Sequence, residues 1–370
     1  MTPFRFIVRF LVFVLVFVIV AEGWLRYVMP ASEVPALRQN HTTLVMSFDP
    51  SVESDGLATF GRLTRRLGWW HVNDEGWLSP YNYTKRAPGG HLIALFGNSY
   101  VQALMVPETK HLDVDLHHIL GPSVPVYAFG QSGWYLEQYV ALSRYVRATY
   151  EPDLIVILIG QGDVSKSLSS PGDFPYWWYI TPSGPSYREV PPSAVFVNSR
   201  RDELARKSAL FRYLRYNAEV QIPFAHGGDV GGAPTGGDLV SSQPLTPQAA
   251  QRAVAAALPP TRFMIARLCA ANPGVPIVFA AMGARYLPVS AVAVSPLQPE
   301  MEALREVCAS RSQCHFLDLR MAFSSDWAQH HERFEALDGG HYNAHADAVA
   351  ARAIAACIEA AGFLGRSSQP

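Results

Sequence analysis

Short, almost wholly apolar segments recur along the middle and C-terminal parts of the chain. They are Leu92–Phe96, Val124–Phe129, Asp153–Ile159, Pro276–Ala281 and His315–Leu319. Runs of this length without helical spacing are typical of strands buried on both faces of a parallel sheet. The first three runs end at polar stretches that contain glycine, which indicates a tight turn at the end of each strand.

Segments with helical spacing lie between these runs. We expect helices at Leu112–Leu120, Leu136–Tyr150, Arg262–Ala271, Pro299–Ala309 and Ala344–Ala361, and a short one near Val101–Leu104. The alternation of strands and helices predicts an α/β fold, a doubly wound parallel sheet with helices on both faces. A ligand site in such a fold lies at the carboxyl ends of the strands.

The N-terminal residues carry the strongest hydrophobic signal of the chain. Phe10–Ala21 is uninterrupted and apolar, with Arg5 and Arg9 before it and Trp24 and Tyr27 after it. Arginines before the run place the N-terminus in the cytoplasm, and the aromatic residues suit the opposite membrane interface. We therefore predict a single-pass signal-anchor over residues 1–29, in a cell inner membrane, with the remainder in the periplasm or extracytoplasmic space.

A cleaved signal peptide is the alternative, because Ala21 and Gly23 form a small-x-small cleavage pattern. Both interpretations export the rest of the chain. Residues 30–89 mix proline, polar and aromatic residues without a sustained period, and we interpret them as a membrane-proximal stalk packed on the main domain. Short strands are expected around Val72–Trp77.

The main domain is expected over residues 90–365, with an insertion at about 164–260. The insertion contains an aromatic cluster, Phe174–Tyr179, a basic amphipathic segment, Arg200–Val220, and a Gly-rich stretch, His226–Gly237. The basic segment is interpreted as one helix with a solvated face. The aromatic cluster fits either a local core or a surface that stacks on sugars.

Composition narrows the function classes. Hydrophobic residues make up 49% and charged residues 16% of the 370, which fits a globular protein with an added apolar segment. A formal net charge of −1 gives no electrostatic basis for binding nucleic acid. The four cysteines show no zinc-type spacing. In an oxidising compartment Cys308 and Cys314 would close a small loop, and unpaired buried thiols are the alternative.

Candidate chemistry gathers in four polar stretches. Three follow predicted strands and contain Ser99, Ser132-Gly133 and Gly160–Asp163, and the fourth, with Asp338 and His341, precedes the last helix. Serine hydrolysis needs a nucleophile, a base that takes its proton and a carboxylate that orients the base. Taken singly, Ser99 fits a helix N-cap, and Asp338 and His341 fit a surface pair. Their expected position at one edge of the sheet favours the catalytic interpretation.

The four stretches together resemble the blocks of SGNH (GDSL-type) hydrolases over about Asn73–Gly362. This resemblance implies a flavodoxin-like SGNH hydrolase fold, with Ser99 as nucleophile, His341 as base and Asp338 as its carboxylate. It also implies an oxyanion hole with the backbone N–H groups of Ser99 and Gly133. Joined to the apolar N-terminus, the chain is most similar to membrane-anchored bacterial members, some of which act on acyl esters of extracellular polysaccharides.

Two positions depart from the family pattern. Asn98 stands where the family has Asp, and an amide there still donates and accepts hydrogen bonds. Gly162 stands where the family has the Asn that supplies the third oxyanion donor. Loss of one such donor typically costs roughly 100- to 1,000-fold in rate. The neighbouring Gln161 is a candidate substitute.

The sequence therefore predicts an exported serine esterase or O-acyltransferase that acts on acyl esters, with acetate expected, of a glycan or small molecule. The alternative is a catalytically attenuated protein of the same fold that binds a polysaccharide or scaffolds a membrane assembly. Trp134, Trp177 and Trp178 are candidate substrate-binding residues. Partners would be the acylated carbohydrate or ester, the lipid bilayer and a membrane acyl-transfer protein. No metal or organic cofactor is implied.

Overall fold

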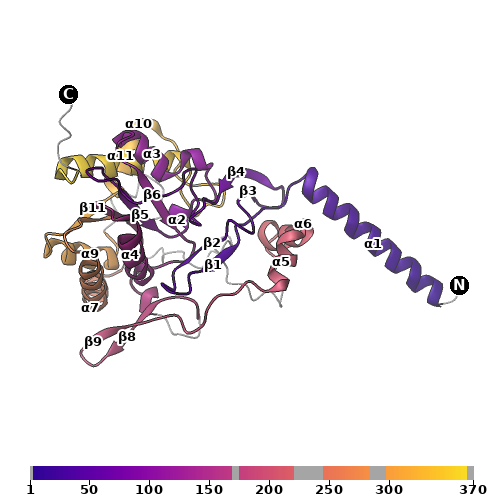
Figure 1. Ribbon diagram of the computed structural model, residues 1–370, viewed down its shortest axis with the longest axis horizontal. Helices are drawn as coiled ribbons and strands as arrows, with labels where there is room; N and C mark the ends of the chain where they lie inside the picture. The colour runs from indigo at the N-terminus through magenta and orange to yellow at the C-terminus, as the bar shows by residue number, and fades with distance from the viewer. Residues whose placement is uncertain (1–2, 169–174, 221–244, 283–296, 365–370) are drawn as a thin grey trace.

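The computed structural model describes residues 3–168, 175–220, 245–282 and 297–364. A parallel sheet with the strand order β11-β10-β7-β5-β6 forms its centre (Figure 1). The strands are β5 (Ile93–Gly97), β6 (Val126–Gly130), β7 (Leu154–Ile159), β10 (Ile277–Ala281) and β11 (Cys314–Asp318). Each predicted strand is present within a residue or two of its expected bounds.

Helices cover both faces of this sheet. One face packs on α4 (Leu136–Tyr150), α7 (Pro247–Ala271) and α9 (Pro299–Ala309), and the other on α3 (Leu112–Leu120), α10 (Arg320–His330) and α11 (Ala344–Ala361). Side chains alternate between the two cores along β5, with Ala94 and Phe96 in the first core and Ile93 and Leu95 in the second. The predicted doubly wound α/β fold is confirmed.

The strand order creates a switch point at β5. The chain runs from β5 outward to β6 on one side and returns to β7 on the other, so the connections on the two sides cover opposite faces of the sheet. Gly97 pairs in register with Gly130. The loops after β5, β6 and β7 therefore open at the same carboxyl edge, which is where doubly wound sheets bind ligands.

Two helices differ from the sequence prediction. α7 begins at Pro247, capped by Thr246, and continues through Pro259 and Pro260, whereas the prediction started at Arg262. Its first turns are largely exposed, so they lack the apolar stripe that marks a helix in sequence. α10 (Arg320–His330) was not predicted from the sequence.

Residues 30–90 form two hairpins that pack on the sheet. The strands are β1 (Leu37–Gln39), β2 (Met46–Phe48), β3 (Asp55–Phe60) and β4 (Arg65–His71). The strand expected at 72–77 is wrong, because Val72 and Leu78 form an isolated bridge around a turn. Trp77 lies 5.0 Å from the Phe129 ring. Tyr83 Oη donates to Ala128 O at 2.8 Å, which fixes this region against β6.

The insertion divides into several short elements. It contains a hairpin, β8 (Tyr179–Ser183) and β9 (Ser186–Val190), that the sequence did not indicate. The single helix expected at 200–220 is instead α5 (Arg200–Lys207), α6 (Ala209–Arg212) and a π-helix, η3 (Tyr213–Asn217), because Ser208 is extended and caps α6. Phe174 and His226–Gly237 lie outside the described residues.

The N-terminal helix α1 (Pro3–Tyr27) projects from the domain (Figure 1). It contains an 18-residue window with a mean hydropathy of 2.7, none of it buried, so by length and composition it is able to cross a membrane. A membrane anchor and a signal sequence both fit this helix. Its last turns differ, since Leu25 is buried against Ala31 and Ala209.

Candidate active site

Ser99 begins α2 (Ser99–Gln102), immediately beyond the carboxyl end of β5. Asn98 occupies the helix N-cap, and its Oδ1 accepts a hydrogen bond of 3.2 Å from Tyr100 N. The N-cap residue is therefore Asn98. The alternative that Ser99 is the N-cap residue is wrong. Ser99 is half-buried, and its hydroxyl is committed to a contact across the sheet edge.

That contact joins Ser99 to His341 and Asp338. His341 Nε2 lies 2.7 Å from Ser99 Oγ, and His341 Nδ1 is hydrogen-bonded to Asp338 Oδ2. The structure thus brings together the three side chains that the sequence interpretation selected, although 242 positions separate Ser99 from His341. A serine, an imidazole and a carboxylate in this order form the geometry of a nucleophile, its base and an orienting group.

Asp338 is held as a carboxylate. Burial of its side chain, which is 6% exposed, acts to raise the pKa, but hydrogen bonds and charge from His341 and two backbone N–H groups outweigh it. These N–H groups belong to Gly340 and His341 and lie 3.0 and 3.1 Å from Oδ1. The pKa of Asp338 is consequently lowered from its ordinary value. An ionised Asp338 fixes a proton on Nδ1 and leaves Nε2 to face the Ser99 hydroxyl.

Tyr100 braces the loop that carries this pair. Its hydroxyl donates to Gly340 O, and its ring lies 5.0 Å from the His341 ring and 4.7 Å from that of Tyr342. Tyr100 is 2% exposed. The residue after Ser99 therefore locks the distant loop 338–341 onto the end of β5. Sequence gave no signal for this role beyond the position of Tyr100 next to Ser99.

Gln102 fixes the second loop. It is 1% exposed, and its Oε1 accepts hydrogen bonds from Ser132 N, at 2.6 Å, and from Ser132 Oγ. A side chain at Gly130 would place Cβ 2.2 Å from Gln102 N, so only glycine allows β6 to pass this close to α2. The loop that contains Gly133 is in this way held against the helix that begins at Ser99.

Gly133 itself adopts a left-handed conformation, with φ of 79°. A Cβ there would lie 2.6 Å from Trp177 Cη2, so the indole of Trp177 packs directly on this glycine. The Trp177 ring also lies 5.8 Å from that of Tyr135. An aromatic side chain from the insertion is therefore placed beside the loop assigned to the oxyanion hole.

The third loop is organised by Glu300 of α9. Gly162 N donates to Glu300 Oε2 at 2.8 Å, and Val164 N and Ser165 N also donate to this carboxylate. Gly162 was a candidate oxyanion residue. It has no side chain, and its N–H is directed to Glu300, so its place in an oxyanion hole stays a prediction. Gln161 is exposed on the loop that follows β7.

The three candidate substrate-binding tryptophans differ in position. Trp134 is 2% exposed and packs edge-on to Trp77 at 6.3 Å, so it is part of the core. Trp177 and Trp178 are half-buried and line a small pocket together with Tyr176 and Trp134. Trp177 packs on Gly133, a candidate oxyanion residue. Its role in binding substrate stays a prediction.

The cysteines are free thiols, and Cys314 has a neighbour that the sequence did not indicate. Cys314 Sγ lies 3.3 Å from Cys269 Sγ, at the end of α7, and all four cysteines are free thiols. Cys314 therefore has a thiol neighbour on a distant helix in addition to Cys308, which also hydrogen-bonds to it. Within the described ranges no group of three His, Cys, Asp or Glu side chains is placed to hold a metal ion.

No family model matches the sequence, and no curated protein matches it. Solved structures similar to the chain include a lipase, Lip_vut3, from a goat rumen metagenome, at 10% identity and a TM-score of 0.38, covering 75% of this chain and 99% of that one. A carbohydrate acetylesterase family member from Sinorhizobium meliloti has 12% identity and a TM-score of 0.34, covering 74% and 99%. The salicylyl-acyltransferase SsfX3 from a tetracycline biosynthetic pathway has 12% identity and a TM-score of 0.36, covering 76% and 58%.

Proposed function

We propose that this protein is a serine esterase or O-acyltransferase that acts on acyl esters. The contact of 2.7 Å between Ser99 Oγ and His341 Nε2, with Asp338 on the opposite ring nitrogen, carries the proposal. A serine and a histidine packed for structural reasons alone have no need of a buried, ionised carboxylate behind the imidazole. Here that carboxylate is present, and the serine remains partly open to solvent at the edge of the sheet.

In the proposed reaction, Ser99 Oγ attacks the ester carbonyl while His341 Nε2 takes the hydroxyl proton. Asp338 stabilises the imidazolium that forms. The tetrahedral intermediate collapses when His341 returns the proton to the departing alcohol oxygen, which leaves an acyl group on Ser99. Water as the second acceptor completes hydrolysis, and a sugar hydroxyl as acceptor completes transfer. Both routes use the same three side chains and need no cofactor.

The oxyanion of this intermediate requires fixed donors. Backbone N–H groups of Ser99 and Gly133 are assigned to it, and the anchoring of the Gly133 loop by Gln102 supports their alignment. Gln161 is the proposed third donor, because it is exposed on the loop after β7 and is the neighbour of Gly162.

For the substrate we propose an acylated glycan, with acetate as the acyl group. Trp177 supports this choice, because its indole packs on Gly133 and lies within reach of a ring bound above the oxyanion loop. The apolar helix α1 supports anchoring in a cell inner membrane with the domain on the extracytoplasmic side. A membrane acyl-transfer protein is the partner expected for the transferase route.

One observation favours the alternative, an attenuated protein of the same fold that binds a polysaccharide or scaffolds a membrane assembly. Gly162 supplies neither a side chain nor its N–H to an oxyanion, because Glu300 accepts that N–H. A hole with two backbone donors is weaker by about 100-fold or more than one with three. The alternative therefore predicts a bound glycan without acyl release.

Acetyl release by the purified full chain in detergent tests the proposal. We expect hydrolysis of p-nitrophenyl acetate and of an acetylated oligosaccharide, lost by at least roughly 1,000-fold in Ser99→Ala. Ser310→Ala, at the exposed C-cap position that follows α9, is the matched control and should keep full activity. Acetate release that is equal in the wild type and Ser99→Ala would reject Ser99 as nucleophile. Oligosaccharide binding without any release would establish the alternative.

A further inference from the structure

The two ends of α1 have different surroundings. Phe4 to Val20 carry exposed apolar side chains, whereas Leu25, one turn beyond the apolar run, is 5% exposed and packs on Ala209 of α6. Packing on the domain thus begins where the membrane-type sequence ends. The helix is exposed along the length that would lie in lipid and attached at the turn that would leave it.

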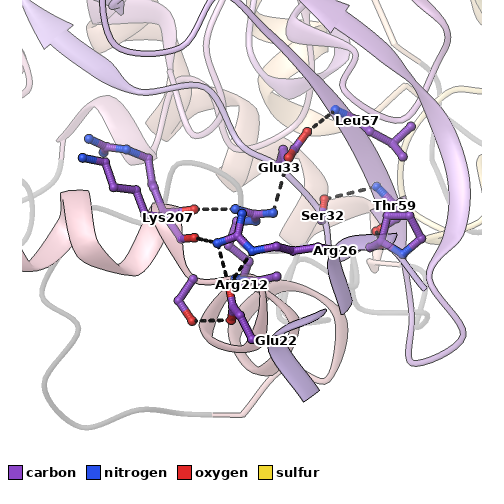
Figure 2. A network of polar contacts seen from close by, with 12 residues as sticks. Glu22, Arg26, Ser32, Glu33, Leu57, Thr59, Lys207 and Arg212 are labelled. Carbon is purple, nitrogen blue, oxygen red and sulfur yellow. Dashed lines mark hydrogen bonds and ion pairs between the residues drawn. The ribbon is translucent and has the colours of Figure 1, made fainter. Parts of the chain in front are cut away.

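A polar clasp makes this attachment, as Figure 2 shows. Glu22 accepts hydrogen bonds from Ala209 N at 2.8 Å, Leu210 N at 2.9 Å and Ser208 Oγ at 3.0 Å. Arg26 donates to Glu22 and to Lys207 O. The carboxylate of Glu22, on α1, therefore accepts hydrogen bonds from the first N–H groups of α6. These groups would otherwise lack partners at the helix start.

The clasp continues into the domain. Arg212 pairs with Glu33 at 3.3 Å, and Glu33 accepts a hydrogen bond of 2.9 Å from Leu57 N on β3. Tyr213 Oη donates to Arg62 O at 3.1 Å, which ties η3 to the turn between β3 and β4. α1, the α5–η3 segment and the β3–β4 hairpin thus form one connected unit. Figure 1 shows the hairpin and α6 beside the C-terminal end of α1.

The position of Glu22 sets the depth of this unit in a membrane. The apolar run ends at Ala21, so Glu22 lies at the boundary between hydrocarbon and headgroups. A helix rises 1.5 Å per residue, so Tyr27 lies roughly 7–8 Å further out, and the headgroup layer is about 5–7 Å thick. Groups that hydrogen-bond Glu22 must lie at the same level. The α5–η3 segment and the adjoining β3–β4 turn therefore lie in or beside the headgroup layer.

The turn has the composition that anionic headgroups attract. Residues 56–71 include three arginines and no Asp or Glu. Arg62, Arg65 and Arg66 are exposed, and Leu63 between them is 74% exposed. Arginine forks bind phosphate oxygens, and each basic residue near an anionic surface contributes about 1 kcal/mol. Three acidic side chains of the unit have hydrogen-bond partners within it: Glu22 and Glu33 as described above, and Asp202, which accepts from the N-cap Ser199.

We propose that Arg62, Arg65 and Arg66 bind the headgroups of anionic phospholipids in the leaflet where α1 emerges. The turn and the Glu22 clasp would then hold the domain in one orientation on the membrane, where a glycan substrate is presented to it. This inference rests on the membrane anchoring of α1 proposed above. It also implies that α1 is retained, because cleavage after Gly23 would remove Glu22 from the clasp.

The full chain in lipid nanodiscs tests the proposal by hydrogen–deuterium exchange of the peptide that covers residues 61–66. In discs with equal parts of phosphatidylglycerol and phosphatidylcholine, we expect exchange at least about 3-fold slower than in discs of phosphatidylcholine alone. The turn between β8 and β9, on the far side of the molecule in Figure 1, should not change. Salt at about 1 M should remove the protection.

Variants and a free anion complete the test. Arg65→Gln/Arg66→Gln should abolish the protection, whereas Arg252→Gln, an exposed arginine on α7, should retain it. Equal protection by about 10 mM inorganic phosphate in neutral discs would overturn the lipid assignment, as would exchange that is independent of lipid charge. A chain that fails to enter discs would instead reject the anchor itself. The two failures are therefore distinguishable.

Discussion

Gln102 Oε1 accepts a hydrogen bond of 2.6 Å from the backbone N–H of Ser132, and this bond links the helix that begins at Ser99 to the loop that contains Gly133. The proposed nucleophile and the proposed oxyanion donor Gly133 are thereby held by one hydrogen bond between their two segments. Gln102 is 1% exposed, so water has no access to replace the bond. The alignment of the site depends on a side chain that takes no part in the proposed chemistry.

We expect Gln102→Met to lower kcat for a short acyl ester by about 10-fold, with little change in KM, since the oxyanion contact is stronger in the transition state. The buried N–H of Ser132 also loses its acceptor, at a cost of about 1–3 kcal/mol. Steady-state kinetics and thermal unfolding measure both effects. Gln329→Met, at an exposed position on α10, is the control. Unchanged kcat in Gln102→Met would show that the loop aligns without this bond.

Gly133→Ala should reduce kcat by about 10-fold or more. The new Cβ would lie 2.6 Å from Trp177 Cη2, and φ of 79° is strained for alanine. Gly184→Ala, in the β8–β9 turn, has φ of 57° and open space around its Cβ, so it isolates the general backbone cost. Equal activity in the two variants would remove Gly133 from the oxyanion hole.

The sequence predicted the central sheet well because its strands are buried on both faces and so leave uninterrupted apolar runs. Leu154–Ile159 is fully buried along its length, and it was recognised almost to the residue. β1 and β2 have only three residues each, and β4 contains one fully buried residue, so these strands leave no continuous apolar run; short strands were therefore expected around Val72–Trp77 instead. The predicted helix was shorter than α7 because the first half of α7 is exposed and two prolines lie inside it, and both features are typical of loops.

For the candidate site, the sequence indicated the proposed reacting side chains but not the residues that position its loops. Ser99, Asp338 and His341 were selected because their stretches resemble the blocks of SGNH hydrolases, and the structure brings the three side chains together. Gln102 and Glu300 were missed, since each acts through a buried hydrogen bond to a loop far away in sequence, at separations of 30 and 138 positions. A single sequence contains no spacing rule that pairs such residues.

Glu137 should make stability fall as the pH rises. Burial, and then the nearby charge of Glu189, raise its pKa to about 8, against the weaker opposite effect of Arg144 and Arg267. Neither carboxyl oxygen has a hydrogen-bond partner among the described residues. The folded state therefore binds a proton that the unfolded state has released, and stability present below about pH 4.5 is lost progressively up to about pH 8.

Glu137→Gln should abolish this contribution. We expect the variant to raise the thermal midpoint relative to the wild type at pH 8 and to differ little from it at pH 5. The contribution from one group has a slope of up to about 1.4 kcal/mol per pH unit. Thermal unfolding at a series of pH values measures it, with the exposed Glu306→Gln as control. An identical pH dependence in wild type and Glu137→Gln would show that this carboxyl is ionised in the folded protein.

Export should oxidise Cys269 and Cys314. Their sulfur atoms lie 3.3 Å apart, and the hydrogen bond between them raises the pKa of the Cys269 thiol, which slows uncatalysed reaction. In exchange with a protein disulfide, the two thiols lose two protons and two electrons, and the partner disulfide is reduced. Closing a loop of this size stabilises by about 3–4 kcal/mol.

Non-reducing peptide mapping of exported protein should therefore recover Cys269 linked to Cys314, with Cys357 free. Cys269→Ser should lower the thermal midpoint of the oxidised protein, whereas Cys357→Ser should lower it less because no link is lost. A peptide that joins Cys308 to Cys314 would contradict this pairing, and four free thiols in exported protein would show that the pair stays reduced.

Covalent trapping of the nucleophile tests the central claim most directly. The full chain is treated with a fluorophosphonate, digested, and analysed by mass spectrometry for the modified residue. We expect one adduct, on Ser99, with none in Ser99→Ala and labelling slowed by at least about 100-fold in His341→Ala, because the hydroxyl then loses its base. Absence of an adduct on Ser99 in the folded wild-type chain, or labelling that persists in Ser99→Ala, would contradict the account.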